Sequence, residues 1–307
     1  MVSIMLFFGF LLILLALIVT ISENDDDKST RQIYSTNNQK NTFVLPDNTN
    51  KISANYFSDR DNLKSIYFYG DDTEIDTATF AGCEKLKQVN LPSNLSEIKP
   101  LTFAYCKSLT TIDIPDSVTH IGNGAFLNCE SLTEIEIHGH IGRDSFAGCS
   151  SLKKIKFDNY VMKEIPEGAF RQCKRLENLY IPFPVECIES NSFSDCEALK
   201  KIYLPISIEF IGSSAFKNCT SLTDITLASS TTHIDRSAFD NCKELSCIII
   251  PNSYTHIDVS NDSFTGIENK VEIKYFTGER PSKKELQEIL KGKDLTTLNW
   301  LKTSEGE

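Results

Sequence analysis

The sequence predicts an α/β-type solenoid: a right-handed coil of ten repeats, each about 23 residues long with one short parallel strand. The first observation is an isoleucine that recurs at Ile52, Ile75, Ile98, Ile121, Ile141, Ile165, Ile188, Ile211, Ile234 and Ile257. The second is a phenylalanine five residues later, at Phe57, Phe80, Phe103, Phe126, Phe146, Phe170, Phe193, Phe216 and Phe239, with Phe264 displaced by two. Most intervals are 23 residues, one is 20 and one is 24, a regularity that excludes chance.

Each repeat ends in a predicted strand. In the unit that begins at Ile211, the alternation Ile225–Thr226–Leu227 places two apolar side chains on one face, whereas the preceding segment has helical or turn-like spacing. Proline ends the strand at Pro92, Pro115, Pro182, Pro205 and Pro251. One coil cannot bury its apolar side, but stacked coils share a core. The pattern therefore predicts a leucine-rich repeat solenoid, a rod on the order of 45–50 Å long.

The units IGSSAFKNCTSLTDITL, IGNGAFLNCESLTEIEI and IESNSFSDCEALKKIYLP closely resemble the BspA-like leucine-rich repeats. The resemblance covers residues 52 to about 276 and is specific for the fold, because it extends over all ten units. It implies a cell-surface or secreted protein, since members of this family from bacteria and parasitic protists are associated with adhesion to host proteins and to other cells.

The first 22 residues are predicted to be a signal-anchor or a signal peptide. Between Ile4 and Ile21 the chain has no charged residue, and this run of 18 residues is near the length that crosses a bilayer. No Lys or Arg precedes it and the cleavage context around Ser22 is poor, which favours an uncleaved anchor. Either interpretation exports the rest of the chain. Residues 23–51 are polar and rich in Asn and Asp, and are predicted to form a flexible stalk.

Two terminal segments are expected to close the repeat domain, residues 52–276. Arg60 stands in the first repeat where later repeats have cysteine. In residues 277–307, Ser282 and Glu285 have the spacing of a capping box, and Leu286, Ile289 and Leu290 share one helical face. This segment is predicted to be a C-terminal helical cap, or a tail that binds a partner.

Eight of the ten cysteines occupy the same place in the repeat: Cys83, Cys106, Cys129, Cys149, Cys173, Cys196, Cys219 and Cys242. In an exported chain, so many cysteines are compatible with disulfide bonds. Equivalent positions in successive coils point the same way, however, so their side chains run parallel and do not converge. We therefore expect a column of buried thiols, with Cys187 and Cys247 outside it.

The sequence does not indicate an enzyme, a cofactor or a metal site. It contains none of the common phosphate-binding, nucleophile or zinc-protease motifs. His120, His140, His233 and His256 precede opening isoleucines and form one column, which is not the converging arrangement that a tetrahedral metal site needs. The net charge of -11 argues against a nucleic-acid partner, and no small-molecule substrate is expected.

Outward-facing strand residues are the expected recognition surface, on the concave side of the array. We predict a partner-binding site that includes Tyr180, Tyr203, Lys154, Lys156, Lys201, Asp113 and Glu136. Acidic residues gather early on this surface, and lysines with two adjacent tyrosines gather in its middle. Tyrosine is common at binding hot spots, although it also suits a strand for its own sake.

These observations predict a non-enzymatic protein, anchored at the cell surface or secreted, that adheres to a protein or glycan on a host or neighbouring cell. The alternative is a structural or antigenic coat protein without a specific ligand. Asn94, Asn218 and Asn261 begin the sequons NLS, NCT and NDS and are candidate glycosylation sites.

Overall fold

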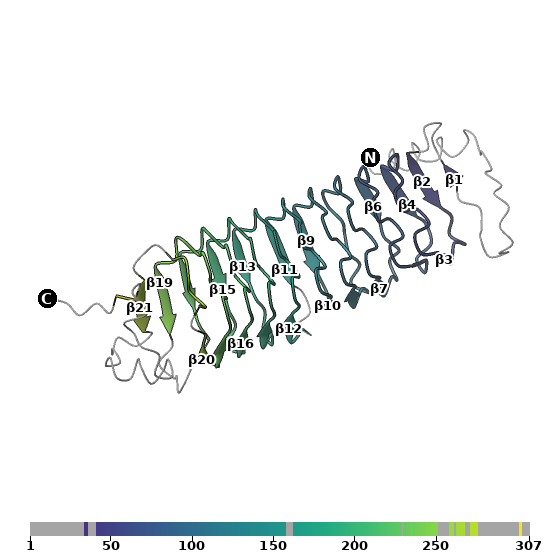
Figure 1. Cartoon of the computed structure of the whole chain (residues 1–307). Coiled ribbons are helices and arrows are strands. Elements are labelled where there is room, and N and C mark those ends of the chain that lie inside the picture. Colours follow the sequence, from purple (N-terminus) through teal and green to yellow (C-terminus); the bar gives the residue numbers. More distant parts are fainter. Residues whose placement is uncertain are drawn as a thin grey trace, which may run out of the picture.

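The computed structural model describes residues 34–35, 41–157, 162–228, 230–250, 258–260, 262–267, 271–275 and 301–302. They form a parallel-strand β-solenoid of about nine turns, against the ten predicted repeats. Figure 1 shows the coils stacked side by side into a rod. The predicted signal segment, residues 1–22, and the predicted C-terminal helix lie outside the described residues.

The longer strands line up along one side of the rod. They are β2 (Thr42–Leu45), β4 (Ser65–Phe68), β6 (Gln88–Asn90), β9 (Glu134–Ile137), β11 (Lys154–Phe157), β13 (Asn178–Tyr180), β15 (Lys201–Tyr203), β17 (Asp224–Thr226), β19 (Cys247–Ile250) and β21 (Val271–Tyr275), with β1 (Tyr34–Ser35) and β22 (Leu301–Lys302) at the ends. They pair in three separate sheets, in the orders β1-β2-β4-β6, β11-β9 and β13-β15-β17-β19-β21-β22. All these pairs are parallel except β1 with β2. We call the outward surface of these strands the strand face.

A second row of parallel strands, each of two residues, carries the opening isoleucines from Ile52 to Ile234, and in the last strand the register places Val259 and not Ile257 at this position. These strands are β3 (Lys51–Ile52), β5 (Glu74–Ile75), β7 (Glu97–Ile98), β8 (His120–Ile121), β10 (His140–Ile141), β12 (Glu164–Ile165), β14 (Cys187–Ile188), β16 (Phe210–Ile211), β18 (His233–Ile234) and β20 (Asp258–Val259). The sequence pattern did not predict this second set of strands.

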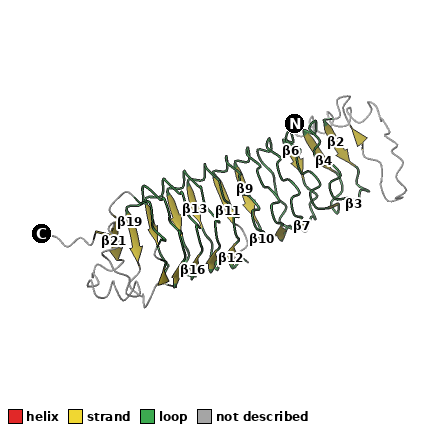
Figure 2. Ribbon diagram, viewed as in Figure 1, coloured by secondary structure: helices red, strands yellow, loops and turns green. Residues whose placement is uncertain are grey.

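Of the helical or turn-like character expected for the return segments, the turn-like one is confirmed, because the described residues contain strands, turns and loops but no helix (Figure 2). The reason is local backbone geometry. Each turn segment places two residues in the left-handed region, as at Asn191 (φ 57°) and Asp195 (φ 60°). A right-handed helix cannot continue through such residues. The fold is therefore a β-solenoid and not an α/β one.

The predicted core is confirmed, and a column of stacked phenylalanine rings runs through it. From Phe57 to Phe264, successive rings have centroids 5.1–5.5 Å apart and are nearly parallel. The rings from Phe57 to Phe239 are fully buried. Burial of each ring stabilises the fold by about 1.5–3 kcal/mol, before any contribution from stacking.

The cysteine column lies beside the rings, as predicted. All eight column thiols are buried and none is bridged in the structure. Each Sγ donates a hydrogen bond to the backbone carbonyl of the column phenylalanine in the preceding coil, as from Cys83 to Phe57 (2.9 Å) and from Cys173 to Phe146 (3.4 Å). A thiol at this position thus fills space and links two coils.

The solenoid begins earlier than residue 52. Strand β2 pairs in parallel with β4, and Phe43 and Leu45 are buried in the core. The predicted stalk boundary therefore cuts through the first described coil. Arg60 is part of this end: its guanidinium lies 5.6 Å from the Phe43 ring centroid and 5.0 Å from that of Phe57. The arginine closes the aromatic column with a cation that water can solvate.

Candidate functional site

The strand face alternates as expected, with apolar side chains buried and their neighbours exposed. In β13, Leu179 is buried and Tyr180 is 66% exposed; in β15, Ile202 is buried and Tyr203 is 43% exposed. The structure divides the seven predicted partner-binding residues into two groups. Tyr180, Tyr203 and Lys201 lie on β13 and β15, whereas Asp113, Glu136, Lys154 and Lys156 lie in earlier coils.

Tyr180 and Tyr203 stack on each other. They are register partners in the β13–β15 pair, their ring centroids are 4.2 Å apart and their planes differ by 9°. Partial desolvation, together with the neighbouring Tyr203, raises the pKa of Tyr180 above its ordinary value. Each ring covers one face of the other, and both side chains nevertheless stay exposed to solvent.

Sequence reasoning missed two further exposed side chains in the same two coils as this pair. Phe183 is 62% exposed and Ile206 is 74% exposed, and each lies three residues after one of the tyrosines. We call Tyr180, Phe183, Tyr203 and Ile206 the aromatic patch. The sequence alone could have revealed Phe183 and Ile206. The residue after the strand-ending proline is apolar at these two positions, but it is polar in the other coils, at Ser93, Asp116 and Asn252.

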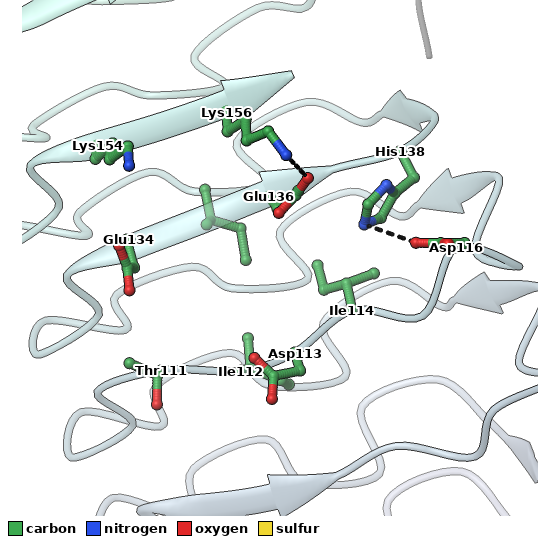
Figure 3. A pocket seen from close by; sticks show the side chains of 11 residues that line it. Thr111, Ile112, Asp113, Ile114, Asp116, Glu134, Glu136, His138, Lys154 and Lys156 are labelled. Carbon is green, nitrogen blue, oxygen red and sulfur yellow. Dashed lines mark hydrogen bonds and ion pairs between the residues drawn. The ribbon is translucent and has the colours of Figure 1, made fainter. Parts of the chain in front are cut away.

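The other four predicted residues surround a hollow of about 330 Å³ in the strand face (Figure 3). Its lining comes from residues 111–116, from β9 with the adjoining His138, and from two lysines of β11. Lys156 forms an ion pair with Glu136 on the neighbouring strand. His138 Nε2 lies 3.6 Å from Asp116 Oδ1.

The hollow coincides with an interruption of the sheet. Asp113 bridges back to Asn90, and β9 pairs forward with β11, but no backbone hydrogen bond joins residues 111–114 to 134–137. The coils are joined on both sides of the gap, where Thr133 N donates to the Thr110 carbonyl (3.0 Å) and His140 N to the Thr119 carbonyl (2.9 Å). The gap is therefore a slot closed at both ends, with residues 111–118 on one side and residues 134–139 on the other.

The length of one repeat explains the interruption. From the strand face to the next opening isoleucine the chain takes eight positions in one coil, from Asp113 to Ile121. In the next coil it takes only five, from Glu136 to Ile141, and this shortening makes the interval from Ile121 to Ile141 the single 20-residue one. Gly139 makes this short turn possible, since a Cβ there would lie 2.1 Å from the Thr119 carbonyl oxygen. Two coils of different length cannot follow the same path, so their strands separate.

In the histidine column, two histidines stack on each other and His233 stacks on Phe210. His120 and His140 are register partners on β8 and β10, with ring centroids 5.1 Å apart. Among the described residues, no group of three or more His, Cys, Asp or Glu side chains is arranged to hold a metal ion.

The candidate glycosylation sites differ in their surroundings. Asn94 is exposed, and its Nδ2 donates to Asp72 Oδ1 (2.8 Å). Asn218 is half-buried in a ladder in which its Nδ2 donates to Asp195 (2.6 Å) and its Oδ1 accepts from Asn241 (2.8 Å). Asn261 lies outside the described residues.

The stacked coils, the repeated Phe and Cys columns and the parallel strand face define a leucine-rich repeat solenoid. The model of the family described as "BspA type Leucine rich repeat region" matches six copies over residues 30–141 and 139–270, and the chain belongs to that family. No curated protein matches the chain. No helix in the described part of the chain is long and apolar enough to cross a membrane.

Similar solved structures are also leucine-rich repeat proteins. One from Bacteroides ovatus, which supports the fold, is 19% identical over 86% of this chain and 79% of its own, with a TM-score of 0.61. A leucine-rich cell surface protein from Faecalibacterium prausnitzii is 26% identical over 81% of each chain, with a TM-score of 0.45. The leucine-rich repeat protein of T. pallidum is 26% identical over 59% of this chain and 78% of its own, with a TM-score of 0.43.

Proposed function

We propose that this chain is a non-enzymatic adhesion protein, anchored at the cell surface by residues 1–22 or secreted, that binds a protein or glycan of another cell or matrix through its strand face. The observation that carries the proposal is the aromatic patch. Four large apolar or aromatic side chains of two adjacent coils are 43–74% exposed there, where the solenoid could have placed polar residues.

The patch is unfavourable to expose and adds nothing to the core. At the position of Tyr180 and Tyr203, other coils carry Asn90 and Thr226, so the fold does not require an aromatic pair. Contiguous exposed apolar surface marks interaction sites, and tyrosine is enriched among residues that dominate binding energy. The stacking also holds each ring in place before binding, so less side-chain entropy is lost when a partner arrives.

The polar groups around the tyrosine pair favour a protein with acidic side chains. Tyr180 and Tyr203 stack on each other, with their ring centroids 4.2 Å apart. Their hydroxyl groups and the exposed Lys201 supply donors for carboxylates of a partner. We therefore expect an acidic protein segment at the patch, and binding that weakens as salt rises.

The test begins with the full chain as bait against extracellular-matrix proteins, cell-surface proteins and glycans. For any partner found, the double variant Tyr180→Ser/Tyr203→Ser should lose on the order of 2 kcal/mol of binding free energy, about 30-fold in Kd. The matched control is Tyr67→Ser, which changes a tyrosine of the same outward column far from the patch. Equal binding by the double variant and the unaltered chain would place the site elsewhere.

Surface exposure is tested separately. Protease added to intact cells should remove the repeats if residues 1–22 anchor an exported chain. Full protection of the repeats would contradict the proposed location. If the screen finds no partner and the chain is nevertheless exposed, the coat-protein alternative is favoured.

A further inference from the structure

The hollow at the sheet interruption is shaped like a receptor for a single long side chain. Its floor is apolar, formed by the buried Ile112, Ile114 and Ile135, and it is closed at both ends by the hydrogen bonds from Thr133 and His140. The strands on its two sides lack the ladder bonds that join regular coils. Backbone donors and acceptors of these strands therefore lack their usual partners across the slot.

The charged side chains around the slot determine whether a cation or an anion can bind there. Asp113 extends from one wall and Glu134 and Glu136 extend from the other (Figure 3). Glu136 is neutralised by Lys156, whereas no ion pair within 4.0 Å involves Asp113 or Glu134 among the described residues. Glu134 faces its register partner Lys154 on β11 without forming an ion pair with it, so Glu134 and Asp113 are the two exposed carboxylates, on opposite walls, that can bond a cation.

We propose that this hollow binds the guanidinium group of an arginine side chain on a protein partner. A guanidinium is planar and carries five N–H donors, so it can bond carboxylates on both walls and backbone carbonyls between them. The aliphatic part of the side chain packs on the isoleucine floor. Lysine fits less well, because its ammonium is compact, more strongly hydrated and cannot form paired planar bonds.

This inference rests on the proposed function in that it adds one feature to the partner. The acidic segment contacts the aromatic patch, and an arginine in an earlier part of the strand face enters the hollow. Lys154 and Lys156 stand on the rim that faces the patch, so the positive group is directed to the opposite side of the slot, between Asp113 and Glu134. A partner with an acidic segment at one end and an arginine at the other could then bind along the solenoid in one direction only.

The test uses a small probe, so it does not require the partner. Saturation-transfer difference NMR on the full chain compares blocked arginine (Nα-acetyl-arginine N-methylamide) with the citrulline analogue, which has the same shape and no charge. We expect the arginine probe to bind in the millimolar range and the citrulline probe to bind at least about tenfold more weakly. Equal binding of the two probes would overturn the proposal.

Two variants locate the site. Asp113→Asn/Glu134→Gln should weaken binding of the arginine probe about tenfold or more. Asp224→Asn is the matched control, because Asp224 occupies the same outward column as Glu134 and lies far from the hollow. An equal loss in the control would show general attraction to an acidic surface and refute a specific site.

The same experiment separates the two proposals. The variant Tyr180→Ser/Tyr203→Ser should bind the arginine probe as the unaltered chain does. If it does, and if the tyrosine variant also keeps full binding to a macromolecular partner, the patch is wrong and the hollow stands. If the unaltered chain binds both probes equally while the tyrosine variant loses the partner, the hollow is wrong and the patch stands.

Discussion

The buried thiol column makes the solenoid sensitive to alkaline pH. Desolvation raises the pKa of Cys83 to about 11 and the pKa of Cys149 and Cys242 to about 12, from an unperturbed 9.0. The same cause raises the pKa of Cys106, Cys129, Cys173, Cys196 and Cys219. Each thiolate would have to form in a dry column between stacked coils.

The sign of the effect follows from proton linkage. The folded-state pKa lies above the unfolded-state value, so between pH 9 and 12 the unfolded chain loses protons that the folded chain keeps. The stability contributed by each thiol is complete below pH 9 and is lost as pH rises toward its folded-state pKa. At pH 10 a thiol shifted from 9 to 12 has lost on the order of 1 kcal/mol, so Cys83, Cys149 and Cys242 together lose a substantial part of a typical domain's stability.

The assay is urea unfolding, followed by circular dichroism under reducing conditions at pH 8, 9 and 10. The unaltered chain should lose stability steeply above pH 9. The variant Cys149→Ala/Cys242→Ala should be less stable at pH 8, but its loss between pH 8 and 10 should be smaller by about 2–3 kcal/mol. A control for the titration of exposed groups is Lys201→Ala, which should follow the unaltered chain. An identical pH dependence in the cysteine variant would refute the desolvated column.

Three further changes test other features. Arg60→Ala should uncover the end of the ring column at Phe57 and destabilise the first coil by about 1–2 kcal/mol, measurable as faster hydrogen exchange in residues 41–68. Tyr105 has a left-handed φ of 62°, at a position where other coils carry asparagine, so Tyr105→Asn should raise the unfolding free energy by about 0.5–1 kcal/mol in a urea titration. In a eukaryotic host, glycopeptide mass spectrometry should find a glycan on exposed Asn94 and little on Asn218, which is half-buried and bonded on both sides, to Asp195 and to Asn241; the reverse occupancy would contradict this interpretation.

The periodic part of the fold could be predicted from the sequence, because every inward position repeats the same chemistry. The stacked rings, the thiol column and the outward direction of Tyr180 all follow from the spacing alone. The second row of strands was not predicted, since two-residue strands leave no alternation to detect. Strand β2 was missed because its coil lacks the Phe and Cys landmarks, although Phe43 and Leu45 occupy inward positions.

The candidate site was harder to predict than the fold, because it lies where the repeat is irregular. The 20-residue interval was visible in the sequence, but whether a short coil tightens its turn or separates its strand is decided by packing between coils. Sequence reasoning placed Lys154 and Lys156 beside the tyrosines, whereas the structure pairs β11 with β9 and starts a new sheet at β13. The apolar Phe183 and Ile206 could have been found by comparing the residues that follow each proline.

The missing ladder bonds between residues 111–114 and 134–137 also weaken the coupling between two neighbouring coils on the strand face. In a linear array, stability is passed from coil to coil through nearest-neighbour contacts, and cooperativity is lost where one contact is weak. The ring column continues through this point, with Phe103 and Phe126 stacked at 5.3 Å, but the backbone coupling along the strand face is absent. The short strands β8 and β10 still pair across this point, so the coils stay joined along that row, and mechanical tension along the chain should open the strand face at the hollow while the short-strand row still holds.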